Sequence, residues 1–381
     1  DFKQYEEDEG TTFLSKMKVE ELKDVVVTDI AQVNSKLDDD EIELTEYDKA
    51  GKVVDSNIYT LIDDVDPVKI FGLEVDAWVN DDDEVFFISI KTSEKDIIFD
   101  TVAEDASKDE VELKVEDDTF DWAEDVDIYV NFAKAKPADV KAGYYGKFVL
   151  EKGEVAFANL FNFTEVNAGV VEEVKNDKLI YNIGDREKSI RFADYEDGIY
   201  VYNAEFDALD IDDIEEDDVI YAWADDKEIF IVVAGEKVEG KITRMNDKQI
   251  TIDGKKYDVA SNATVSDNED EDIYKYIDSG NLTAAAKNLA GEEVIAILDI
   301  NGEIRHVRGD SKATSGKLYG LVLDAYRSGS KYTLRVFNQD GEKVALEVEK
   351  KADWQPFSDY FESNDNYIPV QYEVDKDNVI K

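Results

Sequence analysis

The sequence predicts an all-β protein made of tandem small modules, each a β-barrel or β-sandwich, with little helix. Three observations carry this prediction: β-rich runs paired across polar turns, a steady interval at which these pairs recur, and only four prolines in 381 residues. A chain of this length exceeds what one compact core fills, since single cores stop growing near roughly 250 to 300 residues. We therefore expect several modules.

Hairpins are predicted wherever two apolar, β-branched or aromatic runs flank a polar turn. Clear examples are VDAWVNDDDEVFFISI over 75–90 and IYAWADDKEIFIVV over 220–233. Turn dipeptides such as Asp253-Gly254 supply the positive φ angles that tight connections need. Because proline interrupts strand pairing and is nearly absent, the strands can pair over long stretches.

A repeat follows from the spacing of these hairpins. They recur at intervals of 73, 72, 75 and 75 residues, counted from Val75, Phe148, Ile220, Ile295 and Val370. A second series of β-rich runs has nearly the same period, which indicates one structural unit copied along the chain. The apolar residues of 12–22 have helical spacing instead. We predict an N-terminal segment with a short helix over 1–22 and five β modules over 23–94, 95–167, 168–238, 239–318 and 319–381.

The charge of the chain limits the classes of partner that it can bind. It has 93 acidic and 43 basic residues and a formal net charge of -50. Such a charge repels a phosphate backbone, so we expect no nucleic-acid partner, while divalent cations are favoured. A hydrophobic share of 43% supplies cores that a disordered acidic tail lacks.

Composition also predicts the compartment. The chain has no cysteine, which removes disulfides and thiolate metal sites. No stretch reaches the roughly 20 apolar residues of a membrane span. The chain starts at Asp1 without methionine, and we expect a processed product whose secretion signal and anchoring region precede it. We predict an extracellular protein.

The sequence has few of the residues that usually catalyse reactions. His306 is the single histidine and is expected to face solvent from the predicted strand EIRHVRG. There is no cysteine nucleophile, and no serine lies in a Gly-x-Ser-x-Gly elbow. Paired carboxylates can hydrolyse glycosides, but among 93 acidic residues such pairs arise by chance. We predict no enzymatic activity and no catalytic or cofactor-binding residue.

Four acidic runs are candidate calcium sites, because hard cations take about six to eight oxygen ligands. None has the glycine that the twelve-residue calcium loop requires at its sixth position. Each run alone is also explained as a solvated turn or edge kept from aggregating by its charge. For the whole chain, a charge this large opposes self-association, so we expect at least one bound or condensed divalent ion. The candidate ligands are Asp38, Asp40, Asp81, Asp83, Asp210, Asp212, Asp267, Asp270 and Asp272.

Three segments together carry a longer pattern: VEGKITRMNDKQITIDGKKYDVASNATV from Val238, LAGEEVIAILDINGEIRHV from Leu289 and FGLEVDAWVNDDDEVFFISI from Phe71. An opening strand pair, a Leu-x-Gly step and a closing pair of the VxAxxDxxGxI kind follow one another. This pattern resembles the surface-layer (S-layer) proteins of Gram-positive bacteria, in the part after their S-layer homology motifs. The resemblance implies a secreted coat protein that assembles with itself into a lattice, often with calcium. Since no wall-binding motif occurs here, contact with a cell-wall polymer would need a region outside this chain.

We therefore predict a structural cell-surface protein that self-assembles into an extracellular array with the help of divalent cations such as calcium. Two other classes stay open. One is a phage virion protein, such as a tail or capsid-decoration subunit. The other is a secreted adhesin or polysaccharide-binding protein, which would group exposed aromatic side chains on one face.

Overall fold

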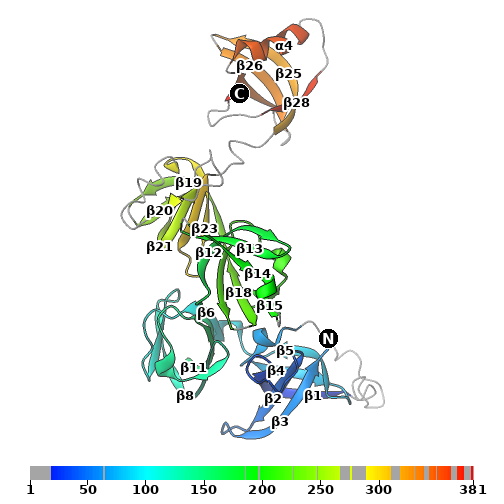
Figure 1. Cartoon of the computed structure of the whole chain (residues 1–381), viewed down its shortest axis with the longest axis vertical. Coiled ribbons are helices and arrows are strands. Elements are labelled where there is room, and N and C mark those ends of the chain that lie inside the picture. The colour runs from blue at the N-terminus through cyan, green and yellow to red at the C-terminus, as the bar shows by residue number, and fades with distance from the viewer. Residues whose placement is uncertain are drawn as a thin grey trace. The chain divides into compact units, whose positions relative to one another are not determined.

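Strands dominate the protein. The computed structural model describes residues 19–381 except 63–64, 185, 196–197, 226, 247, 267–274, 277–288, 310–317, 330, 339–342, 349, 362–366, 373–378 and 381. The described strands form five sheets (Figure 1), with α-helix in α2 (Pro67–Ile70) and α4 (Lys351–Phe361). The predicted all-β class of tandem modules with little helix is confirmed.

The sheets use consecutive strands. The first contains β1 (Glu20–Ile30), β2 (Glu41–Tyr47), β3 (Val53–Leu61), β4 (Glu74–Val79) and β5 (Glu84–Ile90), closed into a barrel in the order β1-β2-β3-β5-β4. The second contains β6 (Ile97–Thr101), β7 (Glu110–Leu113), β8 (Asp118–Val130), β9 (Ala133–Ala135), β10 (Tyr145–Glu151) and β11 (Glu154–Phe161), in the order β6-β10-β11-β8-β7 with β9 beside β8. The third contains β12 (Val166–Lys175), β13 (Lys178–Ile183), β14 (Arg186–Arg191), β15 (Gly198–Asn203), β16 (Ala208–Leu209), β17 (Val219–Ala224) and β18 (Glu228–Ala234), in the order β14-β13-β12-β17-β18-β15-β16.

Two further sheets complete the described chain. The fourth contains β19 (Lys237–Met245), β20 (Gln249–Ile252), β21 (Lys255–Ser266), β22 (Lys275–Tyr276), β23 (Glu293–Leu298) and β24 (Ile304–Gly309), in the order β20-β19-β23-β24-β21-β22 with β20 also pairing with β21. The fifth contains β25 (Leu318–Ser328), β26 (Lys331–Asn338), β27 (Lys343–Val348), β28 (Ile368–Tyr372) and β29 (Val379–Ile380), in the order β28-β25-β26-β27-β29.

Four of the sheets share one connectivity. The first strand pairs antiparallel with the next-to-last strand: β1 with β4, β6 with β10, β12 with β17 and β25 with β28. The last strand pairs in parallel with an earlier one: β5 with β3, β11 with β8, β18 with β15 and β29 with β27. Two parallel strands need a crossover connection, whereas a hairpin joins antiparallel strands. A simple series of hairpins would therefore not produce this arrangement. Its recurrence indicates one structural unit repeated along the chain.

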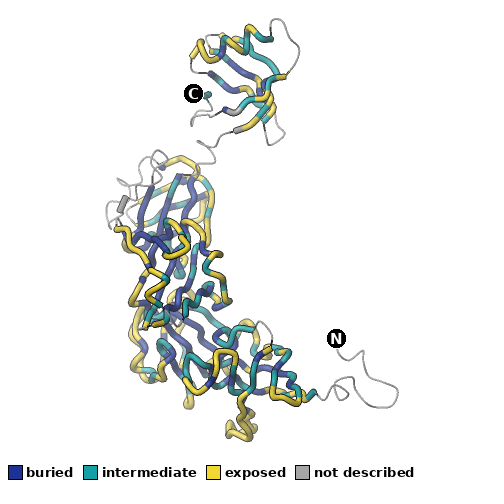
Figure 2. The backbone as a smooth tube through the Cα atoms, turned by 45° about the vertical axis from the view of Figure 1, so that its right-hand side comes forward, coloured by how far each residue is buried: buried dark blue, intermediate teal, exposed yellow. Residues whose placement is uncertain are grey.

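Contacts divide the chain into two units, one of residues 1–236 with 297–305 and the other of 237–296 with 306–381. Within each unit, buried residues run along the strands and exposed residues gather at many turns (Figure 2). No helix among the described residues has the length and apolar character needed to cross a bilayer.

Packing overrides local propensity in α4. Pro356 lies inside this helix and argues against it from sequence alone. Trp354 of α4 nevertheless packs its ring 5.2 Å from that of Tyr332, and its indole Nε1 donates to the carbonyl oxygen of Thr333 at 3.1 Å. The buried indole anchors the helix on the fifth sheet.

Two sequence-based expectations need correction. The end of the predicted N-terminal helix is strand, because Glu20 to Leu22 pair with Val79 to Ala77 of β4, and residues 12–18 lie outside the described residues. His306 does not face solvent. Its side chain is 1% exposed within β24, because both faces of that strand are covered.

Candidate functional site

The turn over residues 38–41 is closed by its own acidic residues. The carboxylate oxygen Oε2 of Glu41 accepts a hydrogen bond from the backbone N–H of Asp38 at 2.9 Å. The N–H of Glu41 donates in return to the carbonyl oxygen of Asp38 at 2.9 Å. Asp38 and Asp40 are both exposed at the entrance of β2. Their side chains are therefore available to solvent ions, while Glu41 holds the turn.

The turn over residues 80–84 joins β4 to β5 and is organised by Asn80. Its side-chain oxygen accepts from the backbone N–H groups of Asp82 at 2.9 Å and Glu84 at 3.0 Å. Asp83 has a φ of 61°, which the short acidic side chain tolerates better than most. Asp81 and Asp83 stand exposed on the outside of this turn.

The acidic run over residues 210–213 caps a 3₁₀ turn. The carboxylate oxygen Oδ2 of Asp213 accepts from the N–H of Asp210 at 2.9 Å, and the N–H of Asp213 donates in return to the carbonyl oxygen of Asp210 at 3.0 Å. This reciprocal pair closes the turn. Asp212 lies between these two residues and is exposed.

The candidate calcium ligands therefore lie in three separate turns, and Asp267, Asp270 and Asp272 lie outside the described residues. Within the described part of the chain, no three His, Cys, Asp or Glu side chains are grouped so that they could hold a metal ion. Calcium binding by these residues stays a prediction.

A second candidate region is the junction, which we define as Asp66, Lys69, Lys147, Tyr202 and Asp207. It joins the first three sheets within the first unit. The Lys147 ammonium, on β10, donates to the carbonyl oxygens of Val68 at 3.2 Å and Lys69 at 2.8 Å in α2. Lys69 in turn forms an ion pair with Asp207, which follows β15. One helical turn, which lies between β3 and β4 of the first sheet, thus contacts a side chain of the second sheet and one that follows a strand of the third.

Burial perturbs the ionisation of the junction. The Lys147 side chain is fully buried, and this burial lowers its pKa from 10.5 to about 7. Burial also raises the pKa of Asp66, whose side chain caps α2 by accepting from the N–H of Val68 at 2.7 Å. Tyr202 hydrogen-bonds to Asp66, and its own pKa is raised by burial. Such shifts mark catalytic sites in enzymes, but ion pairs inside a scaffold produce them as well.

Rings pack beside the junction in an aromatic cluster of Phe132, Phe161, Phe163, Phe206 and Phe230. The ring centroids of Phe132 and Phe161 lie 5.1 Å apart, those of Phe161 and Phe206 5.5 Å, and those of Phe132 and Phe230 4.9 Å. Phe161 and Phe206 are 1% and 0% exposed. Phe161 lies in β11 of the second sheet and Phe230 in β18 of the third, and the other three rings come from the connections beside these strands, so their contacts fix one sheet against the other. The arrangement is that of a rigid scaffold.

His306 is a structural residue. Thr264 Oγ1 lies 2.7 Å from its Nδ1, and Ser266 Oγ lies 3.2 Å from its Nε2. Burial lowers its pKa to about 3, so the ring is neutral at physiological pH. A general base near pH 7 needs a pKa close to that pH and access to substrate.

The junction carries no signal that sequence reasoning could have used. Along YYGKFVLE, Phe148 lies in the core of the second sheet and Lys147 lies on the opposite face of β10. That face would normally meet solvent. Here α2 covers it, and Val68 of α2 lies 79 positions earlier, between two strands of the first sheet.

No family model matches the chain, but two curated bacterial proteins are similar to it. A surface layer protein of Brevibacillus choshinensis is 25% identical over 374 residues, an alignment that covers 85% of this chain and 33% of that protein. The middle cell wall protein of Brevibacillus brevis is 22% identical over 350 residues, covering 78% of this chain and 33% of that protein. The chain thus spans about a third of the length of the relatives it matches.

Proposed function

We propose that the chain is an extracellular, structural coat protein of the surface-layer type, which assembles with copies of itself into an array. The relatives support a role in the envelope rather than in catalysis. Both are cell-envelope proteins by name, which favours a cell coat over a virion.

The observation that carries the proposal is the short, packed connection between the second and third sheets in the first unit. Only four residues separate β11 from β12. Phe163, the apolar residue among them, is 7% exposed and stacks on Phe161 with ring centroids 6.0 Å apart. Sheets joined in this way hold fixed distances, which a lattice subunit needs because small angular errors accumulate over many copies.

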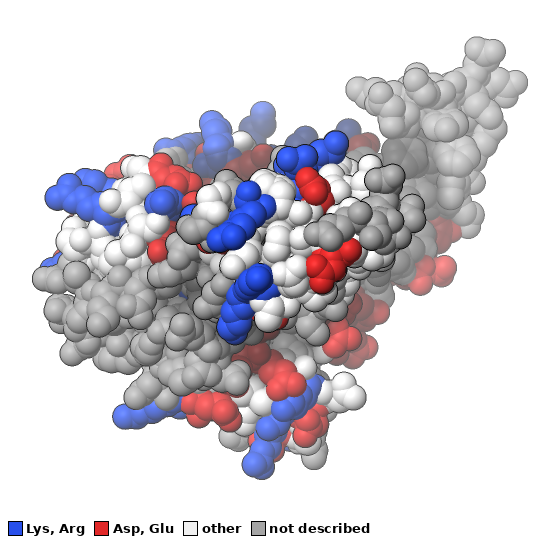
Figure 3. Space-filling model, turned by 90° about the horizontal axis from the view of Figure 1, so that it is seen from above, with Lys and Arg blue, Asp and Glu red and all other residues white. Residues whose placement is uncertain are grey.

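Surplus carboxylates supply the proposed control over assembly. Even if each of the 43 basic residues neutralised one carboxylate, 50 of the 93 acidic residues would remain. Lys and Arg lie among Asp and Glu on the face seen in Figure 3, and exposed pairs such as Lys331 with Glu347 add little stability. We propose that calcium bridges carboxylates of neighbouring molecules, since hard cations prefer oxygen ligands and lower the repulsion between copies. Attachment to a wall polymer is proposed for a region outside this chain.

Electron microscopy of the purified protein tests the proposal. With millimolar calcium we expect planar or tubular arrays, and with a chelator we expect them to disperse into single molecules. Sodium chloride at the same ionic strength is the matched control, because it screens charge without bridging it. Particles that stay monomeric under every condition, or a protein absent from the cell surface in antibody labelling, would overturn the proposal.

A further inference from the structure

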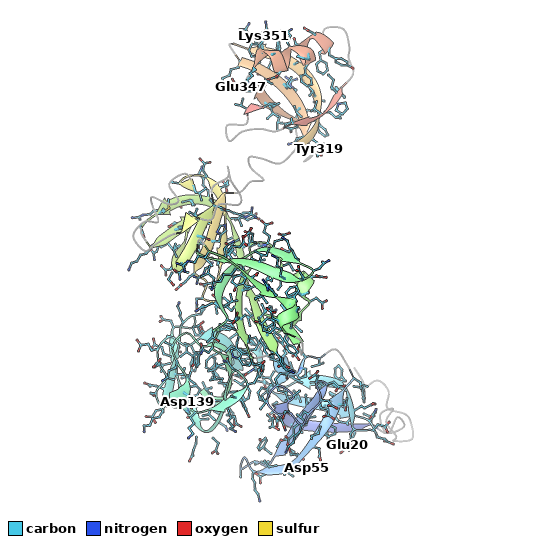
Figure 4. The ribbon with its side chains drawn as sticks, in the orientation of Figure 1. Glu20, Asp55, Asp139, Tyr319, Glu347 and Lys351 are labelled. Atoms are coloured by element: carbon cyan, nitrogen blue, oxygen red, sulfur yellow. The ribbon has the colours of Figure 1, made fainter. Side chains whose placement is uncertain are left out.

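The hairpin of β2 and β3 has an open edge. β3 pairs with β2 along its length, but on its other side it meets β5 only at Thr60 and Leu61. Among the described residues, no strand pairs with the outer side of residues 53–59. Val53 through Ile58 are all exposed, and Figure 4 labels Asp55 on this outer part of the hairpin. Both faces and one edge of the strand therefore meet solvent.

This edge lacks the usual protection against pairing. Natural edge strands carry several charges, proline or inward-pointing lysine. The segment VVDSNIY over 53–59 has one charged residue, Asp55, in a chain of which 36% is charged. Val54 is 58% and Ile58 50% exposed. By contrast, the outer strand β14 reads REKSIR and carries four charges. An edge that is β-branched and nearly uncharged is a strand-pairing site.

A row of hydroxyl groups holds the edge in place. Thr28 Oγ1 on β1 lies 2.7 Å from Thr45 Oγ1 on β2, which lies 2.7 Å from Ser56 Oγ on β3. The Ser56 hydroxyl also donates to Glu43. A strand fixed in this way loses little conformational entropy when a partner binds.

The direction of the free backbone groups follows from the barrel. The N–H of Thr60 points outward, since it donates to Asp83 at 3.1 Å, while the N–H of Leu61 points back to Asp40 at 2.7 Å. Successive residues of a strand direct their N–H and carbonyl groups to opposite edges. Ile58 and Ser56 therefore present their N–H and carbonyl groups to the open edge.

We propose that β3 is a contact between two copies of this chain, which pair antiparallel through this edge about a two-fold axis at Ser56. The inference rests on the proposed self-assembly and names the surface that performs it. In this register Ser56 meets Ser56 of the second copy, Asp55 meets Asn57, and Ile58 meets Val54. A two-fold contact of this kind uses the same patch on both molecules.

The side chains select this register over its neighbours. In an antiparallel pair, a residue that directs its N–H and carbonyl groups toward the partner strand faces a residue that does the same. The sum of the two residue numbers in a facing pair is therefore even, and each alternative register changes this sum by two. A shift toward Asp55 places two Asp55 carboxylates opposite each other, which is destabilising. A shift toward Asn57 places Ile58 opposite Ser56 and loses the apolar pair. In the proposed register Asn57, whose amide donates to its own Asp55 at 2.9 Å, has a second N–H for Asp55 of the other copy.

Disulfide trapping tests the register, and the absence of cysteine from the chain removes any background. Asp55→Cys and Asn57→Cys variants are mixed and oxidised. Opposite residues have Cα atoms about 4.5 to 5.5 Å apart, which a disulfide spans, whereas diagonal residues lie about 7 to 8 Å apart. We expect the mixture to give at least about tenfold more disulfide dimer than either variant alone. Equal trapping in a single variant, or no trapping in the mixture, overturns the proposal.

A blocking substitution tests the contact without cysteine. Ile58→Lys should weaken dimerisation about tenfold or more in sedimentation, because symmetry places the change twice in the contact and each substitution removes a favourable cross-strand pair. Val115→Lys, at a side chain 55% exposed outside this hairpin, is the charge-matched control and should dimerise like the parent. Circular dichroism checks that both variants fold.

The contact and the coat function can fail separately. If Ile58→Lys assembles into the same arrays as the parent, the β3 contact is wrong and the proposed function stands. If the disulfide dimer forms in the predicted register but the parent never forms arrays, the contact stands and the proposed function is wrong.

Discussion

Replacing Lys147 with methionine should make the stability of the first unit less dependent on pH. Methionine keeps a similar length without an ionisable group. In the folded chain the Lys147 pKa is lowered to about 7 from an ordinary value of 10.5. Between these two pH values the unfolded chain binds a proton that the folded chain does not, so stability rises with pH. The cost of burying Lys147 is thus fully present below pH 7 and absent above pH 10.5.

The size of the effect follows from the same two values. The difference between 10.5 and about 7 corresponds to about 5 kcal/mol. Against this stand the two hydrogen bonds to the carbonyl oxygens of Val68 and Lys69, each contributing about 1 kcal/mol. Lys147→Met should therefore be about 2 kcal/mol less stable than the parent at pH 10.5, about 2 kcal/mol more stable at pH 7 and about 3 kcal/mol more stable well below pH 7. The two curves should cross near about pH 9.

Urea unfolding followed by tryptophan fluorescence measures this difference at pH 7, 8, 9, 10 and 10.5. Other groups titrate in this range, including buried tyrosines such as Tyr145 and Tyr202, whose pKa values are raised by burial. They contribute equally to both proteins and cancel in the difference. Lys108→Met, at a side chain 85% exposed, is the control and should follow the parent at every pH. Parallel curves for Lys147→Met and the parent would refute the reasoning.

Three further predictions concern packing and ionisation. Gly72→Ala should destabilise by about 1 to 3 kcal/mol more than Gly143→Ala, because both glycines have positive φ but only at Gly72 would a Cβ meet the Phe157 ring, at 2.3 Å; equal urea midpoints would contradict this. Phe161→Ala should cost about 3 to 5 kcal/mol in urea unfolding, since it empties the centre of the aromatic cluster, and a loss under 1 kcal/mol would argue against a packed joint. The ring signals of His306 should stay constant in NMR spectra from pH 8 to 5, because its pKa is lowered to about 3, and a midpoint near 6.5 would show an accessible ring.

Local sequence patterns were sufficient for much of the fold. Alternation and turn residues identify hairpins such as β4–β5 and β17–β18, because a strand with one face on a core repeats every two residues. Asn and Asp at the turns do more than tolerate their geometry. Asn80, Asn203 and Asp299 each accept backbone N–H groups two and four residues later. These side chains specify the turns directly.

Contacts between distant segments escaped the same reasoning. Lys147 bonds to α2, and Trp354 bonds from α4 to the fifth sheet. No local pattern in the sequence shows which face of a strand such a helix will cover. His306 was misjudged for the same reason, since Thr264 and Ser266 lie about 40 residues earlier. The acidic runs were found readily, but a run along the sequence does not bring carboxylates to one point. In Asp210 and Asp213 the chain uses them to close a turn instead.

The open β3 edge and the large negative charge act in opposite directions on one equilibrium. Backbone pairing at the edge is short-ranged and requires close approach, whereas repulsion between two chains of formal charge -50 acts over a screening length of about 8 Å at physiological ionic strength. In the proposed assembly, this repulsion at low salt keeps the unprotected edges apart. Divalent ions would reduce the repulsion without altering the edge. Under this proposal, acidity and strand pairing are two parts of one control over assembly, and the charge takes the place of the missing edge protection.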